Sequence, residues 1–130
     1  MVEGVLVIDK PPGITSHDVV AAARRILRQP RIGHAGTLDP LATGVLVLVC
    51  GRATRLARFL SASNKTYEAG IRFGLTTDTY DVTGAVLATS EVRPSRRDVD
   101  DAVSTLRGDY LQQPPAFSAR KPSTSGTGGS

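Results

Sequence analysis

The chain has 130 residues, the length of one ordinary domain, and 40% hydrophobic with 22% charged residues is typical of a globular protein. A single cysteine, Cys50, excludes an internal disulfide, and no apolar run approaches the ~20 residues of a membrane span. The N-terminal residues lack the basic region of a signal peptide. We therefore expect a cytoplasmic protein that does not bind membranes.

The net charge is +4, and the basic residues are mostly arginines that occur in clusters. The clusters are Arg24, Arg25, Arg28 and Arg31; Arg52, Arg55 and Arg58; and Arg93, Arg96 and Arg97. The planar guanidinium group matches phosphate and stacks on bases, so these clusters favour a nucleic-acid partner. The alternative is a solvated basic surface.

The first half of the chain alternates short apolar runs with turn residues. Residues 5–9 predict a buried strand, and the prolines and glycine of 10–13 predict a turn. Thr15 or Ser16 can cap a helix over 16–28, because apolar side chains recur there at helical spacing. Residues 45–49 predict a second strand. A short helix should follow Thr54, with three side chains turned inward: Leu56, Phe59 and Leu60.

The second half also mixes strand and helix signals. Alternation over 66–73 predicts a half-buried strand, and residues 86–89 predict another strand. Between them, residues 76–84 predict a polar loop in which Asp78 and Asp81 shape the turn. A helix capped by Ser95 should run to about Leu106, and 112–117 should be extended. The predicted inner stripe of that helix is Val99, Ala102, Val103 and Leu106. Residues 122–130 are rich in Ser, Thr and Gly and should be disordered. The expected class is α+β, with a mixed, mainly antiparallel sheet and flanking helices.

Residues 31–44 form the most informative segment, a polar loop that leads into an apolar strand. An Asp-Pro pair such as Asp39-Pro40 often only caps a turn, but a fixed carboxylate can also act as a nucleophile. His34 can likewise be a turn residue satisfied by the backbone. We expect no metal site, because His34 and Asp39 lack further ligands at useful spacing. His17 and Cys50 receive structural interpretations only.

Five segments of the chain resemble, in order, those of the TruB family of tRNA pseudouridine synthases. They are 4–16 (GVLVIDKPPGITS), 34–44 (HAGTLDPLATG), 65–69 (KTYEA), 73–84 with its Phe-Gly and Thr-Asp-Thr, and 113–119 (QPPAFSA). The resemblance covers residues 4 to about 121. Five motifs in family order are a far more specific signal than one.

The resemblance implies a catalytic role for Asp39 as the nucleophile that attacks a uridine flipped out of its RNA stack. It implies that Tyr67 stacks on the uracil and that His34 lies near the RNA. Lys10 would support the loop or contact RNA. Arg31 begins the loop, and its position there favours a contact with a phosphate. The substrate would be uridine 55 in the T-arm of tRNA, the enzyme a monomer, and no cofactor would be needed.

Two of these roles compete with plainer interpretations. Tyr67 could be a core aromatic on the same strand face as Ile71 and Phe73, and a buried tyrosine would still need a partner for its hydroxyl. Lys10 could be a solvated turn lysine.

The chain departs from the family pattern after residue 121, because family members continue into a region with a catalytic arginine, and many carry a PUA domain. We therefore expect 1–121 to be the N-terminal part of the catalytic domain in a truncated chain without a PUA domain. Three alternatives remain: an inactive tRNA-binding fragment, a dyskerin-like relative that works with guide RNA, and a small basic α/β scaffold. The short segment before Gly4 argues against the dyskerin-like relative.

Overall fold

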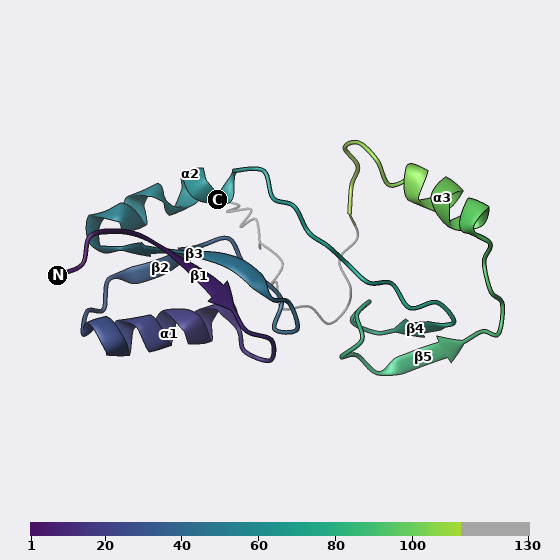
Figure 1. Cartoon of the computed structure of the whole chain (residues 1–130), viewed down its shortest axis with the longest axis horizontal. Helices are drawn as coiled ribbons and strands as arrows, with labels where there is room; N and C mark the ends of the chain where they lie inside the picture. Colours follow the sequence, from purple (N-terminus) through teal and green to yellow (C-terminus); the bar gives the residue numbers. More distant parts are fainter. Residues whose placement is uncertain (113–130) are drawn as a thin grey trace, which may run out of the picture. The chain divides into compact units, whose positions relative to one another are not determined.

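The computed structural model describes residues 1–112, which form two compact units: unit 1 is Met1–Tyr67 and unit 2 begins at Glu68 (Figure 1). Both units combine antiparallel strands with helices, which confirms the α+β class. The predicted motif at 113–119 and the predicted disordered tail at 122–130 lie outside the described residues. The assignment of 1–121 to a single catalytic domain stays a prediction.

Unit 1 is built on a three-stranded antiparallel sheet in the order β1-β3-β2. The strands are β1 (Gly4–Lys10), β2 (Ile32–Ala35) and β3 (Gly44–Cys50). β1 and β3 confirm the two strands predicted in this half. The predicted burial of the first strand is wrong, because β1 alternates and leaves Val5 and Val7 50% and 67% exposed. β2 was not predicted, because four residues that include a glycine and a histidine carry no strand pattern. Pairing with β3, from Ile32 opposite Cys50 to Ala35 opposite Val47, makes this segment a strand.

Helix α1 (Ser16–Leu27) packs on this sheet and confirms the predicted helix. The Thr15 hydroxyl accepts a hydrogen bond from the Asp18 amide at 3.0 Å, and the Asp18 carboxylate accepts one from the Thr15 amide at 2.9 Å. This reciprocal capping box fixes the start of the helix. The buried core that the helix and the sheet share contains Val19, Val20, Ile32, Leu46, Leu48 and Cys50.

The segment after β3 forms a 3₁₀ helix, η1 (Gly51–Leu56), and a short α-helix, α2 (Ala57–Ser61). The predicted inward orientation is wrong for Leu56 and Phe59, which are 50% and 60% exposed; Leu60 is half-buried. Leu56 is the last residue of the 3₁₀ helix, which has 3.0 residues per turn, so the 3.6 period of the predicted stripe does not hold there. Phe59 lies in α2, and the described structure gives no reason for its exposure.

Unit 2 has a two-stranded antiparallel sheet, β4 (Leu75–Thr77) and β5 (Val86–Thr89), and the helix α3 (Arg96–Ser104). The predicted strand at 66–73 is wrong, because this segment has no regular structure and no strand within 1–112 pairs with it. The Ser95–Asp98 capping box of α3 is confirmed. The predicted inner stripe of α3 is wrong. Of its four residues only Val99 is half-buried, and the other three are exposed.

Candidate functional site

Asp39 lies in the loop between β2 and β3, and its side chain is exposed. Its carbonyl accepts a hydrogen bond from the Ala42 amide at 2.9 Å, which closes a turn. A capping role would require the carboxylate to accept backbone amides, yet it makes no hydrogen bond or ion pair with any residue from 1 to 112. The backbone therefore makes the turn, and the carboxylate faces solvent without a protein partner in that range.

Lys10, at the end of β1, has no exposed surface. Its ammonium group donates to the carbonyls of Pro11 at 2.8 Å, Ile14 at 2.7 Å and Pro40 at 3.0 Å. The solvated-lysine interpretation is therefore wrong. All three donors are used, as a buried charge requires, and one of them holds the residue next to Asp39. In this structure Lys10 supports the loop.

The sequence analysis placed His34 in the loop, but the structure places it in strand β2. Its ring Nδ1 lies 2.9 Å from the Gly36 carbonyl oxygen. A carbonyl can only accept, so Nδ1 carries the proton and, in the neutral ring, Nε2 keeps its lone pair. The backbone thus satisfies one ring nitrogen and orients the half-buried ring, while Nε2 has no hydrogen-bond partner among the described residues.

A second cation, the ammonium group of Lys65, lies beside this loop at Gly36, and the sequence did not single it out. The Gly36 φ of +93° is a left-handed conformation, and a Cβ there would collide with the ammonium group of Lys65. Lys65 is exposed and forms no ion pair within residues 1–112. The one signal in the sequence was its place two residues before Tyr67.

The other two predicted site residues are not joined to Asp39. The Arg31 side chain donates to the Thr54 hydroxyl at 3.1 Å, which directs it toward η1, and it remains exposed. Tyr67 is 63% exposed in an irregular segment, so the core-aromatic interpretation is wrong. Its ring is open to a stacking partner, and within the described chain no hydrogen bond links it to the loop.

Positive charge gathers on η1 and α2. Arg52, Arg55 and Arg58 are all exposed, and residues 40–67 contain no acidic residue. Glu3 meets Arg52 at 3.7 Å, and the Arg58 guanidinium lies 4.7 Å from the centre of the Phe59 ring. Exposed arginine side chains of this kind suit phosphate groups.

The predicted polar loop at 76–84 is wrong at its start, because Thr76 and Thr77 belong to β4. Residues 78–84 form a turn, as predicted for Asp78 and Asp81. Asp81 accepts hydrogen bonds from the Thr83 hydroxyl, the Thr79 hydroxyl and the Thr83 amide, which together hold the pKa of its carboxyl below the usual value. Asp78 accepts one from the Ala85 amide at 2.8 Å. Both carboxylates are committed to the turn.

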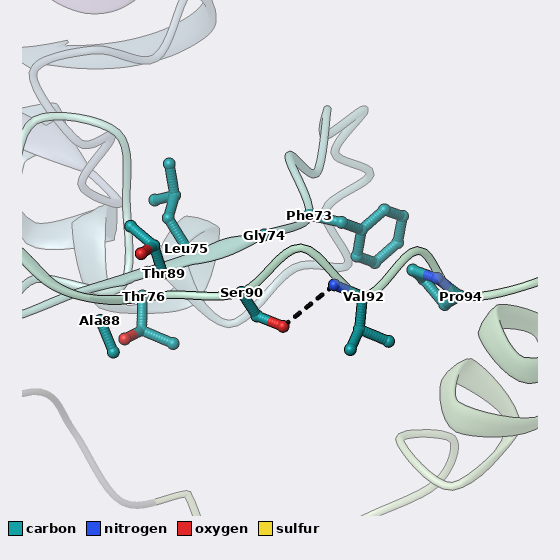
Figure 2. A pocket seen from close by; sticks show the side chains of 9 residues that line it. All are labelled: Phe73, Gly74, Leu75, Thr76, Ala88, Thr89, Ser90, Val92 and Pro94. Carbon is teal, nitrogen blue, oxygen red and sulfur yellow. Dashed lines mark hydrogen bonds between the residues drawn. The ribbon is translucent and has the colours of Figure 1, made fainter.

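A pocket of about 250 Å³ lies in unit 2, and Figure 2 shows its lining and the hydrogen bond from the Val92 amide to the Ser90 hydroxyl. Its lining residues are Phe73, Gly74, Leu75, Thr76, Ala88, Thr89, Ser90, Val92 and Pro94. It contains no charged side chain and none of the predicted site residues. The chemistry of the candidate site therefore belongs to unit 1.

The described residues, 1–112, were compared with the requirements of a metal site and of a membrane span. No three His, Cys, Asp or Glu side chains gather there in a way that could hold a metal ion. No helix in the same range is long and apolar enough to cross a membrane.

Comparison with known proteins gives a consistent assignment. Residues 24–125 match the model of the TruB family pseudouridylate synthase (N terminal domain). The chain is 52% identical over 120 residues to tRNA pseudouridine synthase B of Solibacter usitatus (strain Ellin6076), covering 92% of this chain and 41% of that protein. It is 50% identical over 121 residues to the enzyme of the same name from Bacillus anthracis, covering 92% and 39%. The chain thus spans about two fifths of the length of these relatives.

A solved structure shares the fold. A chain in the crystal structure of a Cbf5-Nop10-Gar1 complex superposes with a TM-score of 0.59 at 28% sequence identity, over 91% of this chain and 31% of that chain.

Proposed function

Because the chain belongs to the TruB family of pseudouridylate synthases, we propose that it isomerises uridine to pseudouridine at position 55 of the tRNA T-arm, with Asp39 as nucleophile. The observation that carries this proposal is a free, exposed carboxylate on a backbone that is held by buried groups. The relatives named tRNA pseudouridine synthase B support the choice of tRNA as substrate.

The reaction is an isomerisation in which the bond between uracil N1 and the ribose breaks and a bond from C5 to the ribose forms. N1 gains a proton and C5 loses one, so no oxidant, reductant or cofactor is required. Asp39 attacks as the carboxylate and stays covalently bound to the substrate while the base rotates; this bond breaks again before the product leaves. The hydrogen bonds to the neighbouring residues hold the main chain from which that carboxylate projects before the substrate arrives.

The remaining residues would bind and orient the RNA. Tyr67 offers an exposed ring on which the flipped uracil can stack, which offsets part of the cost of unstacking. His34 presents the lone pair of Nε2 beside the loop, where it can accept a hydrogen bond from the RNA. Arg31 and the exposed arginines of η1 and α2 would hold phosphates, so affinity should fall steeply with salt.

A second candidate function is tRNA binding without turnover. It is favoured by one observation: no arginine in residues 1–112 forms an ion pair with Asp39, whereas the family pattern expects one. The arginine-rich surface would bind tRNA in either case.

The test uses a T-arm stem-loop RNA labelled with tritium at C5 of the target uridine. The wild-type chain should release tritium and Asp39→Asn should not, whereas Asp9→Asn, an exposed aspartate of the same unit, should match the wild type. RNA binding without release would favour the inactive fragment. If the wild-type chain neither binds the RNA nor releases tritium, both functions are contradicted.

A further inference from the structure

We propose that Ser16 is a positioning residue for Asp39, a role that rests on the proposed function of that carboxylate. Ser16 is the first residue of α1 and is 2% exposed. The sequence had suggested only that Thr15 or Ser16 caps the helix. Its side chain instead bonds to a segment 22 residues further along the chain.

The Ser16 hydroxyl makes two hydrogen bonds to one residue. It accepts from the Leu38 amide at 2.9 Å and donates to the Leu38 carbonyl at 3.2 Å. Both backbone groups of the residue before Asp39 are therefore held by a single buried hydroxyl. A hydroxyl has one donor and two acceptor sites, so this pairing is within its capacity.

The other side of Asp39 is held by different groups. The Pro40 carbonyl accepts from the Lys10 ammonium at 3.0 Å and from the Gly13 amide at 2.8 Å. Asp39 is thus fixed on both flanks, while its own carboxylate stays free. Among the described residues, Ser16 makes the only side-chain hydrogen bonds to the backbone of Leu38, whose own side chain packs against the core of unit 1.

The hydroxyl has no competing duty in the helix. Thr15 and Asp18 make the capping box of α1, and Ser16 takes no part in it. Loss of the Ser16 hydroxyl should therefore release the loop without removing the helix cap. A displacement of about 1 Å can lower a rate by up to about 10²-fold, so Ser16→Ala should reduce kcat at least tenfold and leave KM within about twofold.

The experiment compares Ser16→Ala, Ser16→Thr and Thr15→Ala in the full chain. Thr15→Ala is the matched control, because it weakens the same helix terminus but touches no loop residue. Tritium release gives kcat and KM, and amide hydrogen exchange at Leu38 and Ala42 reports the order of the loop without any need for turnover. Ser16→Ala should lose protection at both amides, Ser16→Thr should retain it, and Thr15→Ala should leave both amides and kcat unchanged.

The outcomes separate the two proposals. If the wild type shows no turnover, the proposed function fails, and the exchange data alone decide whether Ser16 holds the loop. Unchanged exchange in Ser16→Ala would overturn the positioning role. So would a fall in kcat that Thr15→Ala reproduces in full, since that would reflect only the stability of α1.

Discussion

The two units use the same local devices but differ in what they bury. Each has a helix that starts with a reciprocal capping box, at Thr15–Asp18 in unit 1 and at Ser95–Asp98 in unit 2. Within residues 1–112, all the buried hydrophobic residues are in unit 1, whereas Thr77 is the one buried residue within 68–112. Local sequence can therefore start a helix whether or not a core forms beneath it.

The difference in burial also decides which unit can hold a reactive side chain in a fixed position. The loop of Asp39 is held by the buried groups Lys10 and Ser16, and both lie beside the core of unit 1. A reactive group must be placed to within a fraction of an ångström, which requires rigid surroundings. In the described part of unit 2, the carboxylates of Asp78 and Asp81 only stabilise their own turn.

The largest contrast should come from leucine truncation. Leu48→Ala removes a fully buried side chain from unit 1 and should lower the free energy of unfolding by about 2–5 kcal/mol. Leu87→Ala, on the exposed strand β5 with 67% of the residue accessible, should change it by less than about 0.5 kcal/mol. Urea denaturation of both variants measures the two values. Equal losses would mean that the difference in burial between the units does not govern stability.

A smaller contrast concerns two glycines with positive φ. Gly36 in unit 1 has φ +93° and Lys65 against it, whereas Gly108 in unit 2 has φ +84° and open space. Alanine at either site should cost about 1–2 kcal/mol from backbone strain. Gly36→Ala should cost somewhat more, because Lys65 must also move.

The excess at Gly36 can be assigned by a double mutant. In a Lys65→Ala background, Gly36→Ala should cost the same as Gly108→Ala, as judged by urea denaturation. An excess that persists without the lysine would show that the collision is not its source.

The smallest contrast is in the acid titration of two aspartates, the exposed Asp18 and the half-buried Asp81. Hydrogen bonds from the Thr15 amide and hydroxyl lower the pKa of Asp18, and those from Thr83 and Thr79 lower the pKa of Asp81. A lowered pKa in the folded state means that each carboxylate stabilises the protein fully above its unfolded value of about 3.9. That contribution is lost as the pH falls below about 4 and through the folded pKa.

NMR titration of the carboxyl carbons tests the cause of these shifts. Thr83→Val removes the hydroxyl, the largest contributor for Asp81, and should return the pKa of Asp81 toward its ordinary value. The pKa of Asp18 should stay where it is. An unchanged pKa of Asp81 would contradict the hydrogen-bond origin.

Short-range patterns were enough to predict much of the molecule. The strands β1 and β3, the helices α1 and α3 and the cap at Ser95 were predicted, because their signals act within about four residues. For α1 the sequence left Thr15 and Ser16 open as caps, and the structure uses Thr15. The choice of Asp39 came from a motif that is also local. Its role as nucleophile remains a prediction.

Tertiary structure decided the rest, because it depends on pairs of residues far apart in the chain. β2 exists through its pairing with β3, and the expected strand at 66–73 fails for want of a partner within the described chain. Lys10 reaches Pro40 across 30 residues, and Ser16 reaches Leu38 across 22. The sequence by itself determined which residues could cap, turn or react; burial and long-range hydrogen bonds, which no local pattern encodes, decided which of them hold the Asp39 loop in place.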